Sequence, residues 1–595
     1  MKIANLHTFH IPVMGLAYTI DSPIRVAHLG ISSVISVMDD ELMERMNKFY
    51  SEKFELPYQE ISSKMEDFRS RRITAYLNTV DHIVNKKFQD LKSSLMENKK
   101  AVEDFVNTLP NVSELRNDLQ HYLEDHLSLD YLQSALSKFF APGAIDVNIM
   151  TKLDREHYTG KEQLPIQYND AHAALRGFAQ SNLNASVVLS AGMNPRLYAY
   201  FENFENFFPT ENTLPQKRII LKVSDYRSAL IQGQQLAKKG LWVSEYRVES
   251  GLNCGGHAFA TDGQMMGHIL EEFKEKRQEF IETTHQLLCK SLLEKNRFVP
   301  SSPLSVTITA QGGIGTAKEH QFLLEHYQLD SIGWGSPFLL VPEATSTDIQ
   351  TRKLLANAKE EDLYLSDISP LGVPFNTIKG TTNENLKQER IYKNNPGSSC
   401  PRKYLALDRS FFSEGSCTAD RKHQKIALAQ LKENEANLIK EEYTEQFKKI
   451  TEKSCLCVGL ANASLLEQNL PIKGQAQGVV VCPGPNIAYF TKEASLNEMI
   501  DHIYGRDNLI ETTNRPNFLI KELKMYVEHY QKERNECEKE PTNQRIKKMN
   551  KLKDNLLDGI QYYKTLFNAD KQYFYEDNKT IQAQLNTFEK ELTLD

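Results

Sequence analysis

Short apolar runs rich in β-branched residues recur along the chain, and segments whose apolar residues have helical spacing separate them. Runs of this length, bounded by glycine, proline or polar residues, are typical of buried strands. Eight strands alternating with helices predict an α/β fold, a (β/α)8 TIM barrel, with an open doubly wound sheet as the alternative. We expect the eight strands at residues 10–15, 31–37, 144–150, 185–191, 218–223, 241–248, 304–310 and 331–334.

Two further stretches carry many charges among apolar residues at helical spacing, and a third is irregular. The helical stretches have amphipathic faces, which we expect to pack on the barrel or on a second subunit, so a homo-oligomer is one outcome. The predicted divisions are a barrel over 1–37 and 141–350, a helical insertion over 38–140, an irregular cysteine-bearing extension over 351–500 and a C-terminal helical segment over 501–595.

Composition narrows the class of protein. The formal net charge of −7 and the pI near 6.2 argue against a nucleic-acid-binding surface. The N-terminal residues lack the charged start and continuous apolar core of a signal peptide, and no apolar run approaches the roughly 18 residues of a membrane span. Eight cysteines in 595 residues do not form a disulfide scaffold. We therefore expect a cytoplasmic protein with reduced thiols, acting on a small-molecule substrate.

The loops after the sixth, seventh and eighth predicted strands are rich in glycine. They contain Glu249–Gly263, Gln311–Gly315 and Gly335–Ser336. In a barrel of this class ligands bind at the carboxyl ends of the strands, and a phosphate often lies at the loops after strands seven and eight. These glycines predict a phosphate site, and the alternative is that they only turn the chain. No P-loop and no HExxH motif is present, so nucleotide hydrolysis and zinc-protease chemistry lack support.

Four segments resemble the nitronate monooxygenase family, formerly 2-nitropropane dioxygenases, which are FMN-dependent TIM barrels. The segment LNCGGH at 252–257 resembles the family's EAGGH signature, and TAQGGI at 309–314 resembles its AAGGI loop. The stretch GSPFLLVPEA at 335–344 is similar to GTRFLxxxEA, and PVMG at 12–15 is similar to the opening PMxG. The resemblance covers the barrel and is specific for the superfamily rather than for one activity.

The resemblance implies a set of site residues. His257 would face the substrate as the catalytic residue, and a cation at Lys222 would stabilise the reduced, anionic flavin. NAD(P)H is one electron donor that such a flavin accepts. The implied FMN-binding residues are Met14, Gly15, Lys222, Gly255, Gly256, Gln311, Gly312, Gly313, Gly335 and Ser336.

The sequence departs from the family at the substrate side. Asn253 and Cys254 replace a Glu-Ala pair, and Pro337 stands where an arginine is common. Two alternatives to nitronate oxidation follow. FMN-dependent enoyl reductases of fatty-acid and polyketide-type synthesis are similar barrels with the same Gly-Gly-His feature. A non-catalytic scaffold that binds flavin or phosphate would carry the same loops.

Four cysteines of the extension lie close together in sequence, at Cys400, Cys417, Cys455 and Cys457. Glutamate synthases, another FMN barrel family, carry an iron–sulfur cluster after the last barrel strand, but their spacing differs. A single residue between Cys455 and Cys457 is atypical of metal ligands. Buried structural thiols are therefore the favoured interpretation, and a metal or iron–sulfur site is the alternative.

Overall fold

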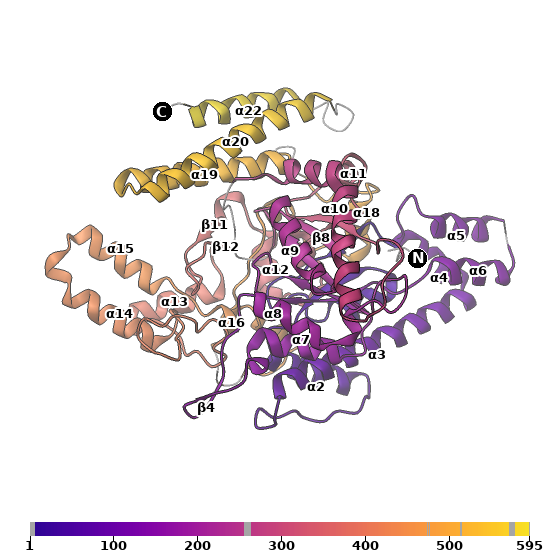
Figure 1. The fold of residues 1–595 in the computed structure, drawn as a ribbon, viewed down its shortest axis with the longest axis horizontal. Helices are drawn as coiled ribbons and strands as arrows, with labels where there is room; N and C mark the ends of the chain where they lie inside the picture. The colour runs from indigo at the N-terminus through magenta and orange to yellow at the C-terminus, as the bar shows by residue number, and fades with distance from the viewer. Residues whose placement is uncertain are drawn as a thin grey trace.

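A computed structural model describes residues 6–125, 127–254, 263–472, 474, 476–511, 515–569 and 578–593. Eight parallel strands of this described part close into a barrel in the order β1-β10-β9-β8-β7-β6-β3-β2 (Figure 1). The predicted (β/α)8 fold is confirmed, and the closed order rules out the open sheet. The barrel strands are β1 Phe9–Ile11, β2 Ser32–Ser36, β3 Ile145–Ile149, β6 Ala185–Leu189, β7 Lys217–Val223, β8 Val243–Glu249, β9 Thr307–Gln311 and β10 Ser331–Gly333.

The outward faces of the strands are apolar and fully covered. Val147, Val187 and Leu221 are buried against helices that return the chain between strands. Period-two alternation places these residues on one face of each strand and their neighbours in the lumen. The covering helices include α7 Asp170–Gln180, α9 Tyr226–Ala237, α10 Met266–Glu294 and α11 Ala317–His326.

The lumen of the barrel contains a layer of the branched aliphatic residues Val34, Val188 and Ile220, as is usual in this fold, and polar layers beside it. The strand register places Asp146, Arg247 and Thr309 in a lining around a cavity of about 290 Å³. The Glu245 carboxylate accepts from Arg247 Nε at 2.7 Å and from Thr309 Oγ1 at 2.6 Å, which compensates the buried charges. Burial raises the pKa of Asp146.

The segment between β2 and β3 is helical, and its outer part is a projection with a core of its own. Residues 42–84 contribute to the main core, whereas Phe88, Leu119 and Leu136 pack in a separate cluster. The projection extends from one side of the barrel (Figure 1). The helices of the segment are α2 Asp40–Lys53, α3 Phe68–Glu97, α4 Lys99–Thr108, α5 Glu114–Glu124 and α6 Leu129–Phe139.

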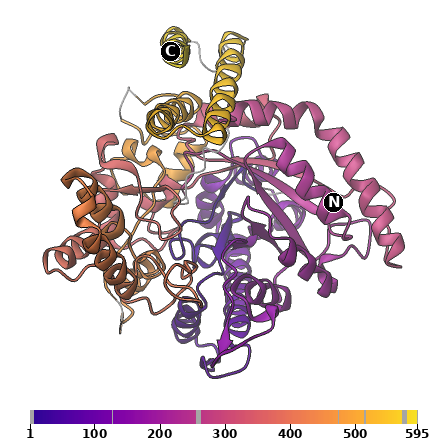
Figure 2. The same ribbon diagram turned by 60° about the vertical axis from the view of Figure 1, so that its left-hand side comes forward.

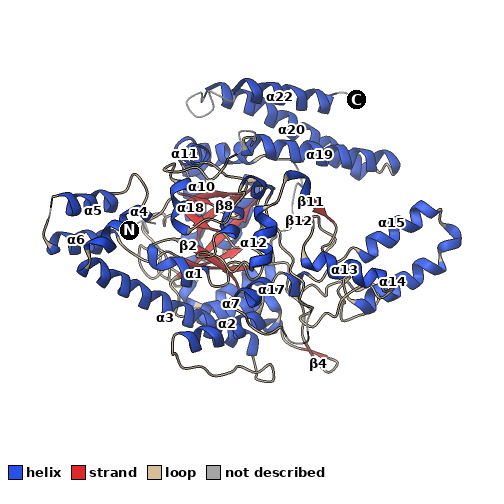
Figure 3. Cartoon of the chain, turned by 180° about the vertical axis from the view of Figure 1, so that it is seen from behind, coloured by secondary structure: helices blue, strands red, loops and turns tan. Residues whose placement is uncertain are grey.

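The chain after β10 lies along one side of the barrel and, at its C-terminal end, along a second side (Figures 2 and 3). It contains the hairpin β11 Leu363–Ser366 and β12 Phe375–Ile378 and a bundle at the C-terminal end of the chain. The described part contains no helix long and apolar enough to cross a membrane. The helices are α12 Ile349–Ala356, α13 Thr382–Tyr392, α14 Arg421–Glu433, α15 Lys440–Thr451, α16 Leu456–Gly459, α17 Asn462–Glu467, α18 Leu496–Ile503, α19 Phe518–Lys539, α20 Asn543–Ala569 and α22 Asn578–Thr593.

The extension shares buried polar contacts with the barrel. Arg402, whose side chain is 0% exposed, pairs with Asp39 at the carboxyl end of β2. Tyr404 Oη donates to Asp39 Oδ1 at 3.0 Å, and Tyr18 Oη donates to the carbonyl of Val480 at 2.7 Å. The extension and the barrel therefore fold around one core.

The buried pair gives a test of this joint core. Replacing Arg402 with methionine leaves the Asp39 carboxylate buried without its cation, so we expect the free energy of unfolding in urea to fall by about 3–5 kcal/mol. The matched control is Arg409→Met, because Arg409 is 62% exposed in its pair with Glu156. We expect that variant to change stability by less than about 1 kcal/mol. Equal losses in the two variants would contradict the shared core.

Candidate functional site

The loops after β1, β8 and β10 meet at the carboxyl ends of the strands. A Cβ built on Gly335 would lie 3.1 Å from Cys254 Cβ, 3.4 Å from Pro12 Cγ and 3.9 Å from Met14 Sδ. The sequence predicted that these loops converge, and in the described residues they do.

The loop after β9 requires glycine for its backbone. Gly312 has φ +117° and Gly313 has φ +83°, conformations that other residues rarely adopt. A Cβ on Gly313 would also lie 2.7 Å from Leu252 Cδ1. Both conformation and packing therefore explain the Gly-Gly pair, so glycine alone is no proof of a ligand here.

The backbone N–H groups of the loops after β9 and β10 are stronger evidence for a ligand than the glycines themselves. The N–H groups of Gly312, Gly313, Ile314, Gly335 and Ser336 donate to no acceptor within the described part of the chain. Gly312, Ile314 and Ser336 are buried. A buried N–H without a partner costs about 1–3 kcal/mol, so such groups almost always bind water, a side chain or a ligand. Successive free N–H groups in a turn form an anion-binding concavity.

A polar cluster lies at the carboxyl ends of β7, β8 and β9. The Glu249 carboxylate is 3.2 Å from Lys222 Nζ, and Glu249 Oε1 accepts from Gln311 Nε2 at 2.7 Å and from Asn253 Nδ2 at 2.8 Å. The Gln311 side chain is also hydrogen-bonded to the buried His10. The sequence analysis named Lys222 and Gln311 but missed Glu249, although a carboxylate ending a barrel strand was a usable signal.

Residues 479–486 of the extension cover the rim, and we call them the rim segment. Gly484 N donates to Ser336 Oγ at 2.8 Å, and Cys254 Sγ donates to the carbonyl of Cys482 at 3.3 Å. Asn486 Nδ2 donates to the carbonyl of Ile314 at 2.8 Å. The Ser336 hydroxyl therefore already accepts one bond from the protein and retains its proton for donation.

The Arg515 guanidinium lies beside the loop after β9. Arg515 Nη2 donates to the carbonyl of Gly313 at 2.7 Å, and Nη1 lies 2.7 Å from Glu319 Oε1. Glu319 in turn accepts from Gly315 N at 2.9 Å and closes the capping box of α11 with Thr316. The guanidinium charge is thus compensated within the protein, and the free donors of the loop are its N–H groups.

The predicted catalytic residue His257 lies outside the described residues, as do Gly255 and Gly256. The described residues on either side of this segment contact Glu522 of α19. Its carboxylate accepts from Met266 N at 2.9 Å and binds the Ser250 side chain and Gly251 N. Helix α19 therefore fixes both flanks of the loop that carries the Gly-Gly-His feature.

The four cysteines of the extension lie near one another. Cys400 and Cys417 are in hydrogen-bonding contact, and Cys455 and Cys457 are neighbours of Cys400. Within the described residues, no group of three or more His, Cys, Asp or Glu side chains is placed to hold a metal ion. Cys417, Cys455 and Cys457 are buried, as favoured from the sequence, and Cys400 is partly exposed.

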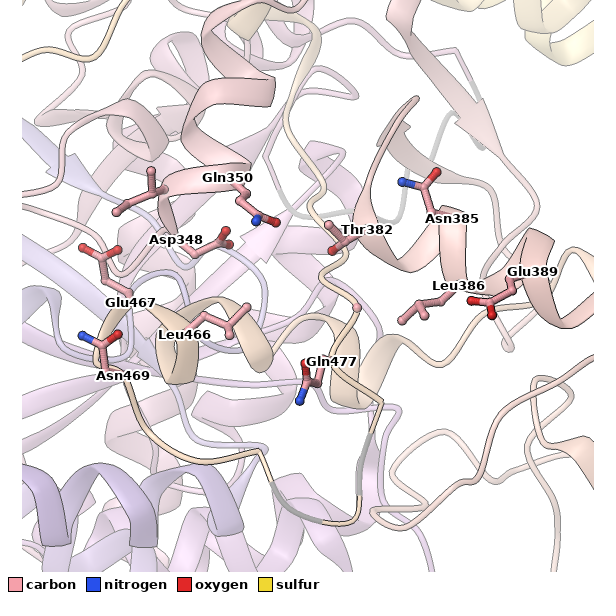
Figure 4. Close-up of a pocket in the computed structure, with 12 residues that line it drawn as sticks. Asp348, Gln350, Thr382, Asn385, Leu386, Glu389, Leu466, Glu467, Asn469 and Gln477 are labelled. Atoms are coloured by element: carbon pink, nitrogen blue, oxygen red, sulfur yellow. The ribbon is translucent and has the colours of Figure 1, made fainter.

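A separate cavity of about 570 Å³ lies among α12, α13 and α17 (Figure 4). None of the predicted site residues lines it. Its carboxylates are engaged by the chain itself, since Asp348 caps α12, Glu467 pairs with Arg352 and Glu389 pairs with Lys393. The cavity therefore offers amide groups rather than an uncompensated charge to a ligand.

No protein-family model and no curated protein matches the chain. Among solved structures, the enoyl reductase domain of MlnA from the macrolactin biosynthesis cluster of Bacillus amyloliquefaciens is 16% identical, with 64% of this chain and 86% of that chain covered and a TM-score of 0.35. FabK from Thermotoga maritima is 11% identical, with 88% and 95% covered and a TM-score of 0.35.

An IMP dehydrogenase/GMP reductase-like protein from Corynebacterium glutamicum is 10% identical, with 62% and 71% covered and a TM-score of 0.26. None of these three proteins is named a nitronate monooxygenase. At such identities and TM-scores the likenesses carry no argument about chemistry, which has to come from the site itself.

Glu522 predicts how stability depends on pH. Burial raises its pKa from 4.5 to about 7, while the pKa values of its neighbours Tyr526 and Tyr563 are raised above 10 and do not titrate there. Because the folded state holds this proton more tightly, the stabilisation is complete below pH 4.5 and is lost as pH rises towards 7.

We expect Glu522→Gln to remove a decline of the order of 3 kcal/mol from the unfolding free energy across that pH window. The control is Glu528→Gln, which changes a 63% exposed carboxylate on the same helix. Urea unfolding at a series of pH values measures both. If the two variants and the parent protein share one slope, Glu522 is not the titrating group.

Proposed function

We propose that this protein is an FMN-dependent oxidoreductase acting on a small molecule. The observation that carries the proposal is the set of five backbone N–H groups, in the loops after β9 and β10, that have no acceptor in the described chain. A phosphate monoester has the charge and the number of acceptor oxygens that such a set needs. The position matches the phosphate site most frequent in this fold.

The residues present fit such a group. The N–H groups of Gly312, Gly313 and Ile314 would bind the phosphate from one loop, and those of Gly335 and Ser336 from the other. The Ser336 hydroxyl, which accepts from Gly484, would donate its own proton to a phosphate oxygen. When bound, FMN supplies reversible two-electron chemistry that protein side chains lack.

The polar cluster at the strand ends would act on the reacting part of the ligand. Glu249 lies 3.2 Å from Lys222 and would hold its ammonium at the mouth of the barrel. Gln311 Nε2 donates to the same carboxylate, which fixes the side chains of this cluster at the strand ends. The sequence resemblance assigns His257 to hold or deliver a proton on the substrate side.

Two activities fit this site. The sequence resemblance favours oxidation of a nitronate, and the Gly-Gly-His feature with its altered flanks equally suits reduction of an enoyl thioester. NAD(P)H would be the electron donor in the second case. The two differ in what reduces the protein-bound flavin without oxygen, a nicotinamide or the substrate itself.

One observation favours a third candidate, a non-catalytic scaffold. The rim segment bonds directly to Ser336 and seats Cys482 on Cys254, so protein atoms cover part of the rim. A scaffold of this kind would bind flavin or phosphate without turnover.

Phosphate recognition can be tested with two ligands that differ only in the phosphate. We expect the purified chain to bind FMN, followed by quenching of flavin fluorescence, at least ~10-fold more tightly than riboflavin, because charge-assisted bonds to several N–H groups are lost with the phosphate. Inorganic phosphate should compete with FMN and leave riboflavin binding unchanged. Equal affinity for both flavins, or binding of neither, would refute the phosphate site.

Replacing His257 distinguishes the enzyme from the non-catalytic scaffold. We expect His257→Ala to retain FMN and to lower the rate of flavin reduction or reoxidation by substrate about 10²–10⁴-fold, the usual contribution of a general acid–base. His285→Ala, which changes a histidine on α10, is the matched control. Anaerobic bleaching by NADH or NADPH, compared with bleaching by a nitronate, assigns the donor. Unchanged rates in His257→Ala would remove its catalytic role.

A further inference from the structure

The loop between α13 and α14, residues 393–420, is unusually long for one without helix or strand. Only two isolated backbone bridges occur in it, Ser398 with Asp420 and Asp408 with Ser416. Even so, Tyr404, Leu405 and Ala419 belong to the main core. A long irregular loop that is packed this tightly usually serves a function, because its ordering costs conformational entropy that regular hydrogen bonding does not repay.

This loop brings two thiols together. Ser398 N donates to the carbonyl of Ala419 at 3.0 Å, and Arg421 N donates to the carbonyl of Ser398 at 2.9 Å. Cys400 and Cys417 flank this bridge, and their thiols are in hydrogen-bonding contact with each other. The backbone thus positions the pair independently of the barrel rim and of any flavin.

The two thiols have different surroundings. Cys400 is partly exposed, and Lys403 contributes both a backbone N–H to its sulfur and a nearby positive charge. Cys417 is buried, 3% exposed. The contact with Cys417 lowers the pKa of Cys400 and raises that of Cys417, with Asp420 opposing the first shift. The accessible sulfur is therefore placed as a nucleophile and the buried one as its resolving partner.

We propose that Cys400 and Cys417 form a redox-active dithiol that reduces low-molecular-weight disulfides, with Cys400 as the nucleophile and Cys417 as the resolving thiol. The site is distinct from the proposed flavin site, and neither proposal depends on the other. Its chemistry needs only the two sulfurs and the disulfide substrate.

The reaction is a pair of thiol–disulfide exchanges. The Cys400 thiolate attacks one sulfur of a disulfide RSSR, the substrate S–S bond breaks and RS⁻ leaves, which gives a mixed disulfide on Cys400. Cys417 passes its proton to the departed RS⁻ and attacks the Cys400 sulfur, which expels the second RS⁻. The dithiol loses two electrons and becomes an intramolecular disulfide, while RSSR gains them and becomes RSH and RS⁻.

Cys455 and Cys457 make a metal site the main competing assignment. They are buried, and burial raises the pKa of both thiols, of Cys455 to about 11. A structural zinc or iron–sulfur site needs deprotonated thiolates in closed coordination. The described residues contain no group of three or more ligands so placed. The dithiol is the assignment that the contacts support.

The test uses the full-length reduced chain, incubated anaerobically with oxidised glutathione and then mapped by peptide mass spectrometry. We expect a Cys400–Cys417 disulfide, restored to thiols by dithiothreitol. In Cys417→Ser we expect glutathione trapped on Cys400, and in Cys400→Ser no reaction at Cys417. Iodoacetamide should alkylate Cys400 at least ~10-fold faster than Cys289, which is also partly exposed but whose pKa is raised by burial.

The control variant Cys289→Ser should behave as the parent chain. The mapping of the parent chain needs no variant, so a folding failure of Cys400→Ser leaves the proposal testable. Stoichiometric zinc or iron in the purified chain, a disulfide between Cys400 and Cys457 instead, or an unreactive Cys400 would each overturn the dithiol.

Discussion

In the part of the chain that the structure describes, backbone N–H groups at the barrel rim lack an acceptor, and this constrains the rest of the molecule. Each costs free energy when buried, so the loops after β9 and β10 are stable only if water, protein or ligand supplies acceptors. In the described residues, the neighbouring side chains donate to the carbonyl groups of the loop after β9 and do not accept from the N–H groups of residues 312–314. His502 Nε2 donates to the carbonyl of Gly315 at 2.8 Å, and Arg515 and Asn486 donate to neighbouring carbonyls. The carbonyls of the loop are therefore satisfied while its donors stay available.

The extension, distant in sequence, builds the rim. The hydrogen-bonded residues Cys254 and Cys482 are 228 positions apart in sequence, and Met266 is 256 positions from its acceptor Glu522. Such long-range contacts explain why the chain continues well past the last barrel strand. The barrel supplies the loops and the polar lumen, and the extension supplies the groups that hold the loops in place. The loop at residues 393–420, which carries Cys400 and Cys417, lies in the same extension but takes part in none of these rim contacts.

In both the lumen and the rim, positive side chains are paired with carboxylates. Arg247 pairs with Glu245 of the same strand in the lumen, and Lys222 of β7 pairs with Glu249 of the neighbouring β8 at the rim. Each buried charge is thereby compensated, as a low-dielectric interior requires. Gln311 connects the two regions, because its Nε2 donates to Glu249 at the rim and its side chain is hydrogen-bonded to His10 in the lumen.

The sequence by itself determined the barrel. Each strand contains a short apolar run bounded by turn residues, so the local pattern located all eight strands. The glycines after β9 and β10 marked the loops of the candidate site. The apolar spacing behind the predicted helices of the insertion and of the C-terminal segment is equally local. The sequence did not reveal Glu249, Glu522 or the rim segment as parts of the site. The rim segment and Glu522 depend on contacts between residues hundreds of positions apart, and no local pattern encodes such a pairing. Glu249 meets Lys222 and Gln311 only because the closed barrel brings their strands together. The Cys400–Cys417 contact likewise required the tertiary structure, because the loop that carries both thiols has no regular element to predict its path.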